Sequence, residues 1–219
     1  MKADLHIHTV HSGDADQTTG QVLERVRDYG LGAVAIADHN SLGGTREALE
    51  IDPDIIVLPA IEVTSSQGHI LAYNVTKEVE RDLSALETIA LIHENGGIAV
   101  AAHPYRLWSG LGERVVREAG FDAIEARNGQ SLEGGNRRAF DLARELGLPM
   151  TGGSDAHTQE RIGKAFTVFP DDCRSADDLV RAILEGRTEL GGSGRPLSSS
   201  FAYGKKCIGL WLHRGMKRL

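Results

Sequence analysis

Short apolar runs alternate with helix-like segments along most of the chain, and this alternation restricts the fold more than any other feature of the sequence. Each run has the length of a buried strand, and the segments between runs place apolar residues on one helical face. Strands are predicted over 3–7, 33–37, 55–63, 98–102, 121–126, 149–153 and 164–169. Helices are predicted from Thr18 or Thr19 to Gly30 and over 44–50, 81–95, 111–119, 132–147 and 175–186.

About seven such units without a break predict an α/β fold, with parallel strands closed or nearly closed into a barrel over residues 1–191. Functional side chains are then expected at the C-terminal ends of the strands. Residues 68–74 are expected to form an extra strand that hairpins back beside the third one. An open doubly wound sheet is the alternative, but no Gly-rich nucleotide loop follows the first strand.

Polar residues able to bind metal follow these apolar runs. The first run ends in His6-x-His8, whose imidazoles point to the same side of a strand. Singly, such residues are more often ordinary polar side chains, but their repetition at strand ends predicts a metal centre. The candidate ligands are His6, His8, Asp14, His39, Glu62, His69, His103, Asp155 and His157.

Nine donors are too many for one catalytic ion, which takes about three protein ligands. They are generous for two ions, so three divalent cations fit best. Imidazole and carboxylate ligands without sulfur suit manganese, zinc or iron better than magnesium or copper(I). A cluster with more positive than negative charge favours a multiply charged anion, above all a phosphate ester.

Charge and composition limit the other classes. The chain has 219 residues and a formal net charge of −7, and no stretch approaches the ~20 apolar residues of a membrane span. The N-terminus leaves no room for a signal peptide's apolar core, so a cytoplasmic protein is expected. Cys173 and Cys207 are too few for a disulfide framework.

The segment 192–219 is a separate basic tail with six Lys or Arg residues and no acid. Without those six positive charges, the remaining body carries −13, which argues against a general nucleic-acid groove. We interpret the tail as a cap whose apolar residues dock on the barrel. The alternatives are a segment resting on anionic lipid and a contact with a nucleic-acid substrate.

The ligand motifs resemble, in this order, those of the PHP (polymerase and histidinol phosphatase) family. The matching segments are Asp4-Leu5-His6-Ile7-His8-Thr9, Ala37-Asp38-His39-Asn40, Glu62 with His69, Ala102-His103-Pro104 and Gly153-Ser154-Asp155-Ala156-His157. The resemblance covers residues 1 to about 190. It implies a distorted seven-stranded (β/α) TIM-like barrel with a trinuclear metal centre and phosphoesterase activity.

Carried over by position, the resemblance also implies a ligand set for each metal. His6, His8, Glu62 and Asp155 would hold the first metal, and Asp14, His39 and His157 the second. Glu62 would bridge to the third, which His69 and His103 complete. The family often has Ser-Asp-Gly where this chain has Ser12-Gly13-Asp14, so Asp16 competes with Asp14 as the loop ligand. Asp4 and Asp38 are expected to orient neighbouring histidines.

Residues outside the ligand set are candidates for binding the substrate. Arg106 and Arg127 follow predicted strands, where a phosphate would need cations, and Asn128 occupies a position where the family often has an asparagine. Arg161 is a weaker candidate. His11 is either a proton donor or a solvated loop residue, and structural roles are expected for two further histidines, His93 and His213.

The function predicted from these residues is hydrolysis of a small phosphorylated metabolite or nucleotide. A hydroxide bridging two cations would attack phosphorus in line. Catalytic roles are therefore assigned to Asp14, His39, Glu62, Asp155 and His157. Three alternatives stay open: a 3′–5′ nuclease or phosphodiesterase on nucleic-acid ends, an amidohydrolase-like enzyme acting on a non-phosphate substrate, and a non-enzymatic metal-holding regulatory module.

Overall fold

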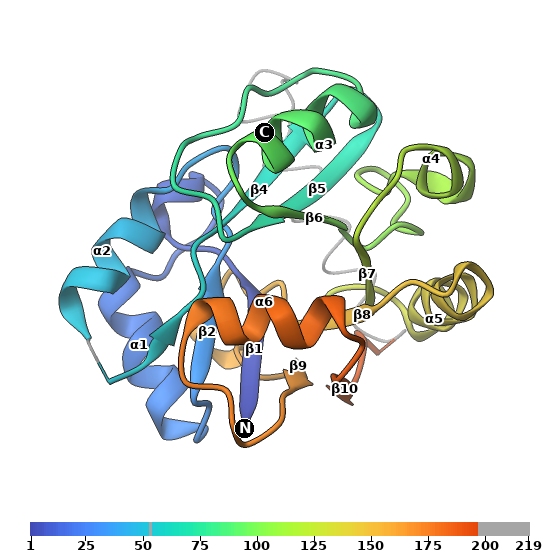
Figure 1. The fold of residues 1–219 in the computed structure, drawn as a ribbon. Helices are drawn as coiled ribbons and strands as arrows, with labels where there is room; N and C mark the ends of the chain where they lie inside the picture. Colours follow the sequence, from blue (N-terminus) through green and yellow to red (C-terminus); the bar gives the residue numbers. More distant parts are fainter. Residues whose placement is uncertain (53, 197–219) are drawn as a thin grey trace.

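Two five-stranded sheets carry the fold in a computed structural model that describes residues 1–52 and 54–196 (Figure 1). One sheet has the strand order β10-β9-β1-β2-β3 and the other β4-β5-β6-β7-β8. The strands are β1 (Lys2–Ile7), β2 (Ala33–Ile36), β3 (Ile56–Val57), β4 (Ala60–Ser65), β5 (Gly68–Tyr73), β6 (Ile98–Ala101), β7 (Ala123–Asn128), β8 (Met150–Gly153), β9 (Ala165–Val168) and β10 (Glu189–Gly192). The helices are α1 (Thr19–Asp28), α2 (Gly43–Ile51), α3 (Ala85–Glu94), α4 (Gly112–Glu118), α5 (Glu133–Leu146) and α6 (Ala176–Leu184), with short 3₁₀ turns η1 (Val10–Ser12) and η2 (Gln159–Arg161).

The predicted closed seven-stranded barrel is wrong. Strand β9 pairs antiparallel with β1 and occupies the edge that a last parallel strand would need. In the described part of the chain, an isolated bridge from Ile7 to Ala156 joins β1 to the segment after β8, and an isolated bridge from His39 to Glu62 joins the β2 side to β4, in place of continuous ladders. The predicted strand 55–63 is divided into β3 and β4 at Pro59, which has no N–H to donate to a ladder.

The predicted hairpin over 68–74 is confirmed, since β5 pairs antiparallel with both β4 and β6. Strand β5, next to the edge strand β4, therefore runs opposite to both of its neighbours in the second sheet. Strand β10 was not predicted, because Glu189–Gly192 contains two glycines and little apolar character. The basic tail lies almost entirely outside the described residues.

Local capping signals explain where two of the helices begin. Thr18 and Gln21 form a capping box at the start of α1, and Ser84 and Glu87 form one at the start of α3. The second box places the start of α3 at Ala85, four residues later than predicted. Helix α5 ends at Gly147, which has the left-handed conformation that glycine adopts at little cost.

Helix α6 covers one end of the space between the sheets. It packs with the beginnings of β1, β2, β6 and β7 in a core of small and branched apolar side chains. Helices α1 and α2 lie beside β1 and β2, and α5 lies beside β7 (Figure 1). The opposite ends of these strands are therefore left for polar side chains. Of the helices formed by the described residues, none has the length and apolar character needed to cross a bilayer.

Close approach of β8 to β1 depends on a glycine. A Cβ atom at Gly153 would lie 2.6 Å from the backbone nitrogen of His6, so Gly153→Ala must push the two segments apart. We expect this substitution to lower the free energy of unfolding by about 2 kcal/mol. Gly134→Ala in α5 is the matched control, since nothing lies within 4 Å of its added Cβ, and it should raise stability by about 0.5 kcal/mol. Urea denaturation of both variants measures the difference, and equal stability would contradict this account of the contact.

Candidate metal centre

All nine predicted metal ligands lie together at one end of the molecule. They come from the ends of β1, β2, β6 and β8, from the β4–β5 hairpin and from the loop that precedes α1. Their donor atoms form four overlapping groups with all atoms of a group within 4.8 Å of one another. The groups are His8, Asp14, His39 and His157; His6, Glu62 and His103; His6, His8 and Asp155; and His39, Glu62 and His69.

Glu62 lies at the centre of the cluster, and its two oxygens face different histidines. Oε2 lies 3.2 to 3.3 Å from ring nitrogens of His6, His8 and His39. Oε1 lies 2.9 Å from ring nitrogens of His69 and His103. A buried carboxylate placed in this way can bridge two cations, one on each oxygen.

Asp14, and not Asp16, lies among the metal-binding donor groups of the described residues. Its Oδ2 is 3.2 Å from Nε2 of His157 and 3.8 Å from Nε2 of His39. Burial raises the pKa of Asp14, but a hydrogen bond and charge from His157 outweigh burial and hold the pKa well below its usual value. The shifted acid of the Ser12-Gly13-Asp14 segment therefore still reaches the cluster.

Two buried acids hold the histidines of the first strand in orientation. Glu125 Oε1 lies 2.8 Å from Nδ1 of His6. Asp38 acts on His8 through a hydroxyl: Ser12 Oγ donates to Asp38 and lies 3.0 Å from Nδ1 of His8. Each contact leaves the Nε2 atom of the histidine directed toward the cluster, as carboxylate partners do in metal sites.

Glu125 is the functional residue that sequence reasoning missed. It lies inside β7, which the apolar pattern predicts as a buried strand, although a carboxylate within Ala-Ile-Glu-Ala is unusual in such a strand. Among the described residues, Asp4 bonds to backbone groups and not to an imidazole ring. It accepts hydrogen bonds from the backbone N–H groups of Ser154, Gly163 and His6, and burial raises its pKa to about 6. Asp4 thus anchors the loop that carries Asp155.

Three non-glycine residues at the site have left-handed backbone conformations. They are Asn40 with φ of 53°, His103 with 27° and Asp155 with 54°. Such conformations cost of order 1–3 kcal/mol each and persist where neighbouring contacts impose them. Here, the backbone N–H of His103 donates to Glu125, and that of Asp155 donates to the carbonyl of His6. The fold therefore strains two predicted ligands into position.

The donor set fits divalent cations. Nε2 of His6 lies 3.1 Å from Nε2 of His8, so two atoms that bind metals face each other in a fully buried place. Buried atoms of four predicted ligands have no hydrogen-bond partner: Oδ1 of Asp14, Nδ1 of His39, Nδ1 of His103 and Oδ1 of Asp155. Buried polar groups are normally satisfied, and these four unpaired atoms belong to residues whose donor atoms already lie within 4.8 Å of one another in groups, so the set fits divalent cations.

The close spacing of charged groups in the cluster shifts the pKa values of several ligand side chains. Burial alone would lower the pKa of His8, but the carboxylates of Asp155 and Glu62 outweigh burial and raise it to about 10. Burial and the charge of Arg106 lower the pKa of His103. The charge of Arg106, together with that of His6, holds the pKa of Asp155 well below its usual value despite burial. The carboxylates are thus ionised and ready to bind cations.

The structure brings two of the three predicted substrate-binding residues to the cluster. Arg106 donates from Nη2 to Asp155 and, at 2.8 Å, to Asn128 Oδ1. Asn128 Nδ2 donates to Glu125 and to Asp155, so this amide connects three polar side chains of the site.

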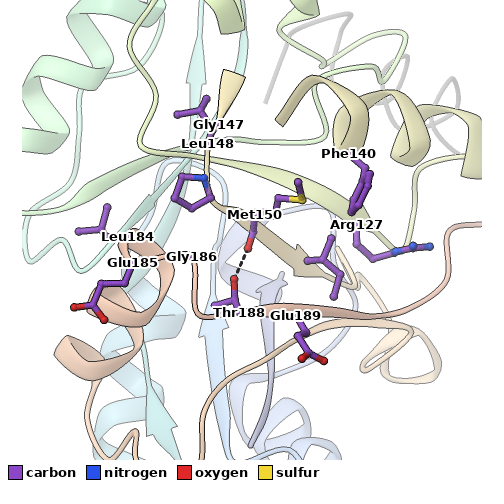
Figure 2. A pocket seen from close by; sticks show the side chains of 12 residues that line it. Arg127, Phe140, Gly147, Leu148, Met150, Leu184, Glu185, Gly186, Thr188 and Glu189 are labelled. Atoms are coloured by element: carbon purple, nitrogen blue, oxygen red, sulfur yellow. Dashed lines mark hydrogen bonds between the residues drawn. The ribbon is translucent and has the colours of Figure 1, made fainter. Parts of the chain in front are cut away.

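Arg127 lies elsewhere, because the β7–β8 register shifts between Glu125 and Arg127. The irregularity brings Asn128, rather than Arg127, to the side of β7 that Glu125 occupies. Arg127 pairs with Glu133 at 2.8 Å and lines a separate cavity of about 590 Å³ between α5, β8 and β10 (Figure 2). That cavity adjoins Met150, at the end of β8 remote from Asp155.

The remaining candidates lie at the edge of the site or away from it. Arg161 donates to the carbonyl of Gly129. His11 lies 3.0 Å from Glu47 and His93 lies 2.7 Å from Asp122, both in exposed pairs. His213 lies outside the described residues.

Known proteins provide a family context. The profile of the PHP-associated family matches residues 133–188. Uncharacterized protein MJ1587 of Methanocaldococcus jannaschii is 32% identical over 147 residues, and the match covers 61% of this chain and 85% of that protein.

The fold is similar to those of two larger solved structures. One is a two-domain protein of Bacteroides vulgatus containing a predicted PHP-like metal-dependent phosphoesterase, with a TM-score of 0.75, 18% identity and coverage of 88% of this chain and 65% of that one. The other is the lesion-specific endonuclease PfuEndoQ of Pyrococcus furiosus, with a TM-score of 0.68, 20% identity and coverage of 86% and 57%. The chain thus spans less than two thirds of either protein, and at these identities the likeness concerns the fold.

Proposed function

The chain belongs to the PHP family, and from this premise we propose that it is a metal-dependent phosphoesterase that hydrolyses a small phosphorylated metabolite or nucleotide. The observation that supports the proposal most strongly is the convergence of nine donors around Glu62. We further propose that these nine residues hold three divalent cations of manganese, zinc or iron. When bound, the cations would supply an activated water and positive charge at the phosphoryl group.

The chain's own residues would hold and orient the ester. In hydrolysis of a phosphomonoester, water adds to phosphorus, the bond from phosphorus to the alcohol oxygen breaks, and that oxygen takes a proton. Arg106 lies beside Asp155, where its guanidinium can bind a non-bridging phosphate oxygen. Asn128 is fully buried and bonded on both sides, so we assign it the positioning of Arg106, Asp155 and Glu125 rather than direct substrate contact.

Replacement of Arg106 tests the binding role. We expect Arg106→Ala to raise KM by about 10- to 100-fold, because a charge-assisted hydrogen bond to the phosphate is lost. Arg137→Ala is the matched control, since this arginine is 76% exposed on α5 and pairs with Asp141 on the same helix. Steady-state kinetics on one phosphomonoester give both constants. A KM unchanged in Arg106→Ala would exclude this arginine from phosphate binding.

Metal binding should depend on pH. His8 has a pKa of about 10 without a cation, so at pH 8 a cation that binds this imidazole must displace its proton. The apparent affinity is therefore expected to rise with pH between 7 and 9, by up to about tenfold per pH unit for each proton displaced. Calorimetric titration in two buffers with different ionisation enthalpies counts the protons released. Binding without proton release would show that His8 is not a ligand.

The proposed function is tested by incubating the manganese-, zinc- or iron-loaded protein with phosphomonoesters, phosphodiesters, nucleotides and single-stranded DNA. Metal content is measured in parallel. Release of phosphate from a monoester class, with about three metals per chain, would support the proposal. Cleavage of internal or terminal phosphodiesters alone would favour a nuclease, the second candidate, which the similarity to PfuEndoQ in fold suggests. Bound metal with no ester turned over would contradict both.

A further inference from the structure

The loop after β6 carries two large apolar side chains that are mostly exposed to solvent. Leu107 is 84% exposed and Trp108 is 85% exposed, the highest values among the large hydrophobic residues described as exposed. Their neighbours differ. Tyr105 lies under the guanidinium of Arg138 and donates its hydroxyl to Glu113, and Arg106 reaches Asp155. The side chains of Tyr105 and Arg106 are therefore bonded to the protein, whereas the next two side chains extend into solvent.

The backbone of this loop is closely constrained. The N–H of Arg106 donates to the carbonyl of His103 at 2.9 Å, and that of Gly110 donates to the carbonyl of Arg106 at 3.1 Å. A Cβ atom at Gly110 would lie 2.5 Å from the Arg106 carbonyl oxygen, so only glycine fits this turn. Trp108 is thus held in place by backbone contacts without packing of its own ring.

Trp108 is also tied to the metal centre on both sides. Arg106, two residues before it, bonds to Asp155. Ser109, the next residue, accepts through its carbonyl a hydrogen bond of 3.0 Å from the backbone N–H of His69. The segment that carries the exposed indole is therefore bonded on both sides to residues around the proposed phosphate site.

We propose that Trp108, supported by Leu107, is a stacking surface for the aromatic base of the phosphorylated substrate. The inference rests on the proposed function and narrows the substrate class to phosphate esters that carry a planar aromatic base. Every nucleobase has a π-face, so any of the bases can stack on an indole ring. The exposed side chains of Leu107 and Trp108 together match the size of one base, whereas a stable protein–protein interface needs about 20–30 residues from each partner.

Fluorescence tests the contact without turnover. The chain has two tryptophans, so Trp211→Phe leaves Trp108 as the only indole. We expect adenosine monophosphate to quench this emission saturably, after correction for absorption by the base, and glycerol phosphate to leave it unchanged. Trp108→Phe, which retains Trp211, should show no saturable quenching. Equal quenching in the two variants, or none in either, would overturn the proposal.

Kinetics with two ester classes test the same contact during turnover. We expect Trp108→Ala to raise KM for the nucleotide about tenfold more than KM for glycerol phosphate, with kcat little affected, and Trp108→Phe to restore most of the difference. Leu49→Ala on α2, where the leucine side chain is 53% exposed, is the control and should change neither KM. An equal rise for both esters would overturn the stacking role, whereas hydrolysis of neither ester by any variant would contradict the proposed function itself.

The source of the base is resolved by comparing a mononucleotide with a short 5′-phosphorylated single strand of DNA. Tighter quenching by the mononucleotide identifies a free nucleotide as the ligand, and tighter quenching by the strand identifies a nucleic-acid end; both support a base on Trp108. Emission that changes with protein concentration, and not with either ligand, would show that a second copy of the chain covers the patch and would overturn the proposal.

Discussion

Asp155→Asn is expected to lower kcat for phosphoester hydrolysis by at least about 10³-fold and to lower the metal content of the protein. A residue that only supports a ligand typically costs 10- to 100-fold, and loss of a ligand should exceed that. Asp155 Oδ1 lies 3.4 Å from Nε2 of His8 and has no hydrogen-bond partner, so it is free to bind a cation. An amide of the same size removes the charge and changes the volume little. Kinetics and metal analysis of the purified variant measure both effects.

The same substitution on the surface provides the control. Asp141→Asn in α5 removes a 57% exposed carboxylate that pairs with Arg137, and it should change neither metal content nor kcat. Circular dichroism and thermal unfolding of Asp155→Asn would exclude loss of the fold, because Arg106 loses its ionic partner there. Full metal occupancy and activity in Asp155→Asn would contradict the proposed ligand set.

The elements of the fold were largely predictable, but their closure was not. Periodicity located the strands and helices because each pattern is a local property of the chain. Which strand edges pair depends on long-range competition: β9 turns back to pair with β1, and Pro59 divides one predicted strand into two. Neither the β9–β1 pairing nor the division at Pro59 alters the local apolar pattern, so the sequence predicts a series of parallel strands.

The proposed ligands, which the structure brings together, were predictable for a different reason. A metal centre needs histidines and carboxylates at strand ends, and these residue types stand out against apolar runs, as His103 and Asp155 do. Their supports were harder to find. Glu125 lies within a predicted strand, so its sequence position gives no sign of a functional role. A register shift between Glu125 and Arg127 determines that Asn128 reaches the site instead of Arg127. A bulge of this kind depends on pairing with β8, which no single segment encodes.

Glu125→Gln is the second substitution for which we expect a large effect, through the protonation of His6. Oε2 of Glu125 accepts from the backbone N–H of His103 and from Nδ2 of Asn128, and Oε1 faces Nδ1 of His6. A carboxylate makes Nδ1 of His6 the protonated nitrogen, so Nε2, 3.3 Å from Oε2 of Glu62, is the atom whose lone pair would bind a cation. In glutamine, the oxygen must face the two N–H donors.

The NH₂ group of the new glutamine would then face Nδ1 of His6 and require it to accept. The proton moves to Nε2, and His6 can no longer bind a cation through that atom. We therefore expect metal affinity and kcat to fall by about 100-fold, with the fold retained because the volume and the hydrogen bonds from His103 and Asn128 are kept. Glu118→Gln on α4, 66% exposed, is the matched control. Calorimetric metal titration and kinetics compare the variants, and unchanged affinity in Glu125→Gln would mean that His6 binds no metal or does not depend on Glu125 for its tautomer.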